Sequence, residues 1–236
     1  MRKIGFSHGD SFKLLDVNTE KNIQILAGCG GNSLEINCHT AKEADSLDKL
    51  LPYIKSFERL SIHAPVNVRY VYNQEIKALL KKLEYFYNRV GAELLVIHPD
   101  LVDDWSVFDD LNMNLAIENM DDRKQSFKDV GDLKDFFDKH PEWSLVLDLG
   151  HCKANDKSMV LAENMILAFR NRIVEIHLSG YKKFHEPLHR TKQKDIIAYC
   201  KDLLVPIIIE SVFEVNDGFE GLKKELDYIL QELSNL

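Results

Sequence analysis

The chain alternates between two hydrophobic patterns along its length. Short runs of apolar and β-branched residues predict strands that are buried on both faces, and longer stretches with helical spacing lie between them. The centres of the runs lie about one βα unit apart. The eight predicted strands are Lys3–Ser7, Ser33–Cys38, Leu60–Ala64, Glu93–His98, Asn114–Glu118, Leu145–Asp148, Ile173–Leu178 and Pro206–Glu210.

Apolar stripes at helical spacing predict helices over residues 44–54, 76–90, 127–137 and 222–233. The run Gly28-Cys29-Gly30-Gly31 follows a predicted helix and precedes a strand, which is typical of a helix stop. A glycine loop that binds phosphate would need the opposite order. The segment 100–110 leaves room only for a short helix.

This alternation predicts an α/β fold, a (β/α)8 TIM barrel that forms a single domain over residues 1–236. An open doubly wound sheet is the alternative. It is disfavoured because no GxGxxG motif opens a helix after the first strand.

Composition and charge narrow the function classes. The chain has 30 basic and 38 acidic residues, a formal charge of −8, which argues against a nucleic-acid partner. No apolar run approaches the roughly 20 residues of a membrane span, and the first residues become polar too soon for a signal peptide. We therefore expect a cytoplasmic enzyme with reduced thiols and no membrane partner. Its four scattered cysteines are Cys29, Cys38, Cys152 and Cys200.

Six successive predicted strands end in residues that bind metals, at the end of the barrel where active sites lie. Strand alternation places each of them on the inner face. Three carboxylates in one mouth would repel each other, and a divalent cation would remove that conflict. A mixture of imidazole and carboxylate suits Zn, Mn, Co or Fe better than Ca. The six residues are His63, His98, Glu118, Asp148, His177 and Glu210.

The strand-end motifs resemble the xylose isomerase-like TIM-barrel superfamily. It includes sugar and sugar phosphate isomerases and epimerases, and the endonuclease IV-like enzymes of AP endonuclease family 2. The matching motifs follow the family's order from strand three to strand eight, and they are more specific for the superfamily than for one reaction. They are Ser61-Ile62-His63-Ala64-Pro65, Ile97-His98-Pro99, Ala116-Ile117-Glu118-Asn119, Leu147-Asp148-Leu149-Gly150-His151, Glu175-Ile176-His177-Leu178 and Ile209-Glu210-Ser211.

The resemblance implies a set of metal ligands. A principal ion would be held by Glu118, Asp148, His177 and Glu210. In endonuclease IV-like members, His63 and His98 would hold a second ion that Glu118 bridges.

A third ion in those members needs a histidine matched by His151, and an Asp-x-His motif after strand seven. His185 matches the histidine of that motif, but Lys183 occupies the aspartate position, and His189 stands where the family often has glycine. We therefore expect one or two ions, unless His189 or Glu186 substitutes.

The leading hypothesis is isomerisation or epimerisation of a sugar, sugar phosphate or similar polyhydroxy carbonyl compound. Glu118 and Glu210 lie on opposite sides of the predicted mouth, and the resemblance implies that this pair transfers the proton, with His151 as a further catalytic residue. The predicted substrate-binding residues are His98, His151, His185, His189, Lys182, Lys183 and Arg190. The three cations would bind a phosphate or lie solvated on the surface.

The alternative is an endonuclease IV-like, metal-dependent phosphodiesterase. His63 and His98 favour it, because a bridged second metal activates water against phosphate. The charge of −8, the incomplete third site and the short loops oppose it. A lyase or dehydratase, and a metal-binding protein without turnover, are further alternatives. Barrels of this kind commonly pair, so a homodimer is compatible with the sequence.

Overall fold

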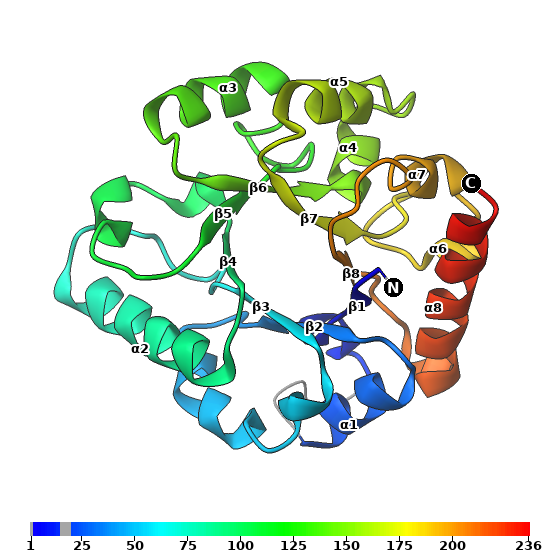
Figure 1. Ribbon diagram of the computed structural model, residues 1–236, viewed down its shortest axis with the longest axis horizontal. Coiled ribbons are helices and arrows are strands. Elements are labelled where there is room, and N and C mark those ends of the chain that lie inside the picture. Colours follow the sequence, from blue (N-terminus) through cyan, green and yellow to red (C-terminus); the bar gives the residue numbers. More distant parts are fainter. Residues whose placement is uncertain (1, 15–19) are drawn as a thin grey trace.

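The structure, a computed structural model, describes residues 2–14 and 20–236, in which eight parallel strands form one closed barrel (Figure 1). Each strand pairs with its neighbour in sequence, and β8 pairs with β1. The predicted barrel is confirmed, and each strand lies within two residues of its predicted bounds. The strands are β1 Ile4–Ser7, β2 Ser33–Asn37, β3 Arg59–His63, β4 Leu94–Ile97, β5 Leu115–Glu118, β6 Ser144–Asp148, β7 Ile173–Leu178 and β8 Ile207–Ile209.

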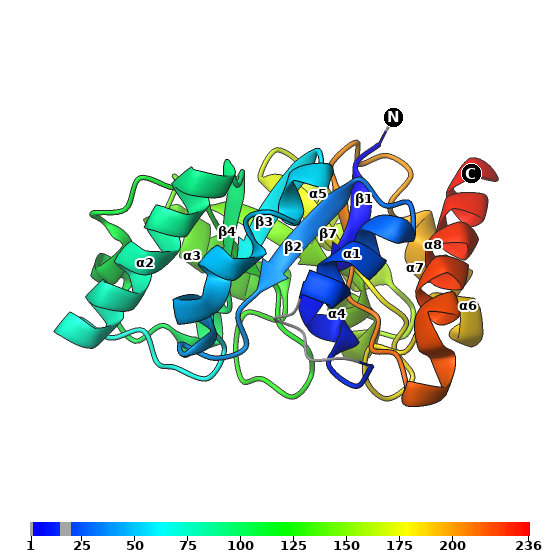
Figure 2. The same ribbon diagram turned by 90° about the horizontal axis from the view of Figure 1, so that it is seen from below.

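Helices surround the strands on the outside, as the views along and across the barrel show (Figures 1 and 2). The stripes predicted over 76–90, 127–137 and 222–233 fall on α2, α3 and α8. Helix α1 ends at Gly28, and Gly30 has a φ of 95°, which confirms the predicted helix stop. The α-helices are α1 Glu20–Gly28, α2 Gln74–Val90, α3 Val130–Lys139, α4 Leu149–Asn155, α5 Val160–Phe169, α6 Leu188–Thr191, α7 Lys194–Ala198 and α8 Gly218–Ser234.

The helix predicted over 44–54 is instead two short 3₁₀ helices, η2 Glu43–Leu50 and η3 Ile54–Ser56. Pro52 explains the break, because it lacks the backbone N–H that a continuing helix would need at this position. Two further 3₁₀ helices, η1 His8–Ser11 and η6 Val215–Asp217, follow β1 and β8.

The fourth unit contains only 3₁₀ turns, η4 Pro99–Leu101 and η5 Trp105–Phe108. An aromatic cluster packs against this part of the barrel wall. The ring centroid of Trp105 lies 4.6 Å from that of Phe136 and 5.2 Å from that of Trp143. The two 3₁₀ turns agree with the short helix expected over 100–110.

One side of the barrel interior is apolar, and another side is polar and charged. Leu94, Val96, Ala116 and Val146 form a small apolar cluster of their own, separate from the large core between the barrel and its helices. The rest of the interior carries buried polar and charged side chains from β2, β3 and β7. All four cysteines are free and buried. Within residues 2–14 and 20–236, every helix is too short or too polar to cross a lipid bilayer.

Candidate metal centre

The six predicted strand-end residues lie together at the carboxyl ends of the strands. His63, Glu118 and Asp148 are the last residues of β3, β5 and β6, and His177 lies within β7. His98 and Glu210 follow β4 and β8 directly. All are buried except His98, whose side chain is 19% exposed. The barrel thus brings three imidazoles and three carboxylates into one cluster.

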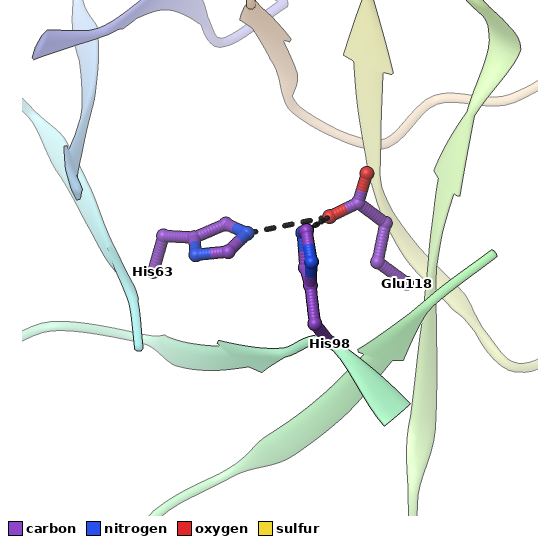
Figure 3. Close-up of side chains that lie close together, drawn as sticks. All are labelled: His63, His98 and Glu118. Atoms are coloured by element: carbon purple, nitrogen blue, oxygen red, sulfur yellow. Dashed lines mark hydrogen bonds and ion pairs between the residues drawn. The ribbon is translucent and has the colours of Figure 1, made fainter. Parts of the chain in front are cut away.

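The carboxylate of Glu118 lies between two pairs of histidines. Its Oε2 atom is 3.3 Å from Nε2 of His63 and 3.2 Å from Nε2 of His98, and Figure 3 shows both rings directed at this oxygen. Its Oε1 atom is 3.1 Å from Nδ1 of His151 and 3.6 Å from Nδ1 of His177. One carboxylate can therefore serve two adjacent cation positions.

Donor atoms of Glu118, Asp148, His177 and Glu210 all lie within 4.8 Å of one another. Among the described residues, Oε1 of Glu118, Oδ2 of Asp148 and Nδ1 of His177 are buried and lie near oppositely charged groups, but none of them makes a hydrogen bond of proper geometry. Unpartnered buried polar atoms destabilise a fold, and a divalent cation would satisfy all three. The donor set of one imidazole and three carboxylates suits Zn, Mn, Co or Fe. These residues fit a metal ion.

A second group of donors, from His63, His98 and Glu118, meets the same 4.8 Å criterion. Two imidazoles and a carboxylate that is shared with the first group form a typical site for such an ion. The described residues therefore fit either one or two ions, with Glu118 common to both positions.

Local structure fixes Asp148 in place. Asp148 is the N-cap of α4, where its Oδ1 atom accepts the backbone N–H of His151 at 2.6 Å, so Oδ2 is left toward the cluster. The side-chain amide of Asn119 donates to the carbonyl of Asp148, and its oxygen accepts the N–H of the same residue. The ends of β5 and β6 are therefore joined by side-chain hydrogen bonds.

A third cluster contains two facing histidines. The Nε2 atoms of His151 and His185 are 3.2 Å apart, and Nδ1 of His185 lies 3.0 Å from Oγ of Ser179. His185 has a φ of 44°, in the left-handed region that is strained for a side chain of this type. Asp148 completes the cluster, and Oδ2 of Asp121 lies 4.0 Å from Nε2 of His151.

Glu186 and His189, the predicted substitutes for the missing aspartate, are engaged elsewhere. The carboxylate of Glu186 accepts the backbone N–H groups of Lys182, Lys183 and Phe184. Nδ1 of His189 lies 2.7 Å from Oε2 of Glu225 on α8.

Burial and neighbouring charges shift the pKa values within the site. Burial opposes a charge on His63 and His151, but contacts with carboxylates raise the pKa of His63 to about 9 and that of His151 to about 10. Burial would raise the pKa of Glu118, yet His177, His151 and His63 hold it well below its usual range. Burial and the carboxylates of Glu118 and Glu210 raise the pKa of Asp148 to about 7, although His151 opposes this.

A cavity of about 150 Å³ opens over the cluster. His63, His98, Glu118, His151, His185 and Glu210 line it, together with Arg123 and Lys124. Four predicted substrate-binding residues do not line it, namely His189, Lys182, Lys183 and Arg190, and the last forms an ion pair with Asp217.

A larger cavity, of about 610 Å³, lies among the starts of the strands, including Leu94, Leu115 and Ser144. It contains none of the predicted site residues. Because barrel active sites lie at the other end of the strands, the smaller cavity is the candidate site.

Solved structures with this architecture cover nearly the whole chain. Endonuclease IV from Thermus thermophilus is similar with a TM-score of 0.71 and 14% identity, over 99% of this chain and 100% of that one. D-allulose 3-epimerase from Methylomonas sp. has a TM-score of 0.69 and 17% identity, over 98% of each chain. The chain shares the (β/α)8 barrel fold of these solved structures.

A probable 3-DHS dehydratase from Bacillus anthracis shares this fold with a TM-score of 0.64 and 13% identity, over 98% of this chain and 99% of that one. No protein-family model and no curated protein sequence matches the chain.

Several residues of this barrel were missed by sequence reasoning. Asp121, Arg123 and Lys124 follow the Glu118 motif on the same loop and line the cavity, and their position just after a strand end was the available signal. Glu35 and Arg59 are buried inside the barrel, where strand alternation alone could have placed them.

Proposed function

We propose that the chain is a divalent-metal-dependent isomerase or epimerase that moves a proton next to the carbonyl group of a small polyhydroxy compound. The observation that supports this proposal is that the carboxylates of Glu118 and Glu210 both lie near Nδ1 of His177. Oε1 of Glu210 lies 3.2 Å and Oε1 of Glu118 lies 3.6 Å from Nδ1 of His177, and both residues line the cavity. They reach this point from β5 and from the end of β8, two different sides of the barrel.

This arrangement suits proton transfer on two faces of one carbon. One glutamate takes the proton and the other returns it, and the roles reverse for the opposite reaction. A bound divalent cation would polarise the substrate carbonyl as a Lewis acid. Burial opposes a charge on His151, but Asp148 and Glu118 raise its pKa to about 10, so this ring would place a positive charge beside a substrate oxygen in the cavity.

The cavity favours a substrate without a phosphate group. Its arginine and its lysine are already paired, since Arg123 forms an ion pair with Asp121, and Nζ of Lys124 lies 2.6 Å from a carboxylate oxygen of Asp100. A volume of about 150 Å³ is below the roughly 300–1,000 Å³ of pockets for drug-sized ligands, so the cavity favours a small substrate. The fold likeness to a D-allulose 3-epimerase is consistent with this class of substrate.

A second candidate is hydrolysis of a phosphodiester at a two-metal centre. The convergence of His63 and His98 on Oε2 of Glu118 favours it, because it provides ligands for a second ion beside the first. The fold likeness to endonuclease IV is consistent with it.

Two assays separate the candidates. One measures deuterium exchange from D₂O into a panel of ketoses and aldoses, and the other measures cleavage of a duplex with an abasic site. We expect exchange without cleavage in protein loaded with Mn²⁺ or Co²⁺. We also expect His98→Ala to retain exchange within about tenfold, since the principal ion keeps its ligands. Cleavage without exchange, lost in His98→Ala, would reverse the order of the two candidates.

A further inference from the structure

A line of buried charged side chains runs through the barrel interior beneath the metal centre. Glu35 comes from β2, Arg59 from β3 and Glu175 from β7. Glu35 and Glu175 are 0% exposed and Arg59 is 4% exposed. None of the roles proposed above uses them.

The line ends on the ring nitrogen of His177 that faces away from the principal cluster. Nε2 of His177 lies 3.2 Å from Oε2 of Glu35 and 3.3 Å from Oε1 of Glu175. Nδ1 of the same ring faces Glu118 and Glu210. The two nitrogens of one imidazole thus face two separate groups of carboxylates.

Glu175 is held by further contacts. Its Oε2 atom forms an ion pair with the guanidinium of Arg59 and lies 3.3 Å from Oγ of Ser61. Arg59 also reaches Glu93, whose side chain is 61% exposed, at 3.3 Å. Glu35 has fewer contacts, because its Oε1 atom has no hydrogen-bond partner among the described residues.

The barrel does not need these charges to fill its interior. Branched apolar residues normally do so, and in this barrel Val96, Ala116 and Val146 do so on the other side. Buried charges are unfavourable unless they are paired, so their presence beneath a single histidine requires a reason. Metal-binding histidines usually donate their second N–H to a carboxylate, which fixes the tautomer and the ring orientation.

We propose that Glu35 and Glu175 are positioning residues for a metal ion: they accept the Nε2–H of His177 and hold the Nδ1 lone pair toward Glu118 and Glu210. Arg59 balances the charge of Glu175 and keeps its carboxylate in place. This inference rests on the metal centre of the proposed function, but it does not depend on which reaction the centre catalyses.

The test measures Co²⁺ binding to metal-stripped protein by calorimetry, with the fold checked by circular dichroism. Glu35→Gln keeps the size of the side chain and removes its charge, and we expect it to weaken Co²⁺ binding by about 10- to 100-fold. Glu93→Gln is the matched control, since Glu93 contacts Arg59 from the exposed side and does not reach His177. The control should stay within about twofold of wild type. If Glu35→Gln does not fold, Glu175→Gln replaces it.

A second readout needs no variant. In ¹⁵N-histidine spectra of Zn²⁺-loaded wild type, His177 should carry its proton on Nε2. The inference would be overturned if Glu35→Gln or Glu175→Gln protein folds and binds Co²⁺ as tightly as wild type. A proton found on Nδ1 of His177 would also overturn it. Tight Co²⁺ binding that Glu35→Gln weakens, in a protein without deuterium exchange, would support the inference and contradict the proposed function. A wild-type protein that binds no Co²⁺ would overturn both.

Discussion

The Nε2 atoms of His151 and His185 face each other across 3.2 Å, and the two rings differ in protonation. Burial opposes a charge on both, but Asp148 and Glu118 raise the pKa of His151 to about 10. Burial and then the charge of His151 lower the pKa of His185 to about 3. A cationic ring therefore donates to a neutral ring, and this contact binds the pair without a cation between them.

This pairing predicts the metal stoichiometry. Because the facing nitrogens of His151 and His185 already bind each other, we expect at most two ions per chain. His185→Ala should leave the number of bound ions unchanged, as measured by mass spectrometry of the metals in desalted protein. Loss of one ion in this variant would show that the facing histidines hold a third. His140→Ala, outside the described clusters, is the control.

Glu210→Gln should reduce deuterium exchange by about 10²- to 10⁴-fold, the usual contribution of a general acid or base. The side chain is nearly isosteric, so the melting temperature of the metal-stripped protein should change little. Glu214→Gln provides the control, because Glu214 is 59% exposed and pairs with Lys13 on the surface. Equal exchange rates in Glu210→Gln and wild type would contradict the role given to this carboxylate.

Metal affinity should rise with pH. The Glu118 contact raises the pKa of His63 to about 9 against the opposing effect of burial, so His63 is protonated at neutral pH when no metal is bound. A metal ligand must lose its proton, and the cost of losing it falls as pH approaches the pKa. Co²⁺ binding between pH 6.5 and 8.5 should tighten by up to about tenfold per pH unit for each proton displaced. A pH-independent affinity would show that binding displaces no proton from His63 or its neighbours.

The lysines of the loop after β7 should not contribute to substrate binding. Lys182 and Lys183 lie outside the cavity lining, and their backbone N–H groups donate to Glu186. The double variant Lys182→Ala, Lys183→Ala should keep KM within about twofold, the range expected for exposed charges. In contrast, Arg123→Ala should raise KM, because Arg123 lines the cavity. A large increase in KM for the lysine variant would mean that this loop contacts the substrate.

The fold and most of the candidate cluster could be predicted from the sequence for one physical reason. In a parallel barrel the carboxyl ends of all strands meet at one rim, so Glu118 and Asp148 had to be neighbours once the strands were recognised. Alternation along each strand also placed both side chains inward. The strand assignment alone was therefore enough to predict that these two carboxylates are neighbours.

Other features depend on contacts between segments that are distant in sequence. The pairing of His189 with Glu225 requires the position of α8, and the sequence alone does not provide it. The same holds for Glu35, which has an inward position on β2 but meets His177 only because the barrel closes. The break in the helix predicted over 44–54 had a local signal, Pro52. The prediction gave more weight to the apolar spacing than to this proline.

The closure of the barrel has a consequence for how the chain folds. Pairing of β1 with β8 brings Ile4 beside Ile207, a contact between distant parts of the chain that forms at a high cost in chain entropy. The same closure gathers the carboxylates of Glu118, Asp148 and Glu210, whose mutual repulsion opposes it. A divalent cation at the proposed centre would bind the closed form and not the open chain, so it would favour completion of the ring by mass action. The supply of metal ions would then govern how much of the newly made chain reaches the closed state.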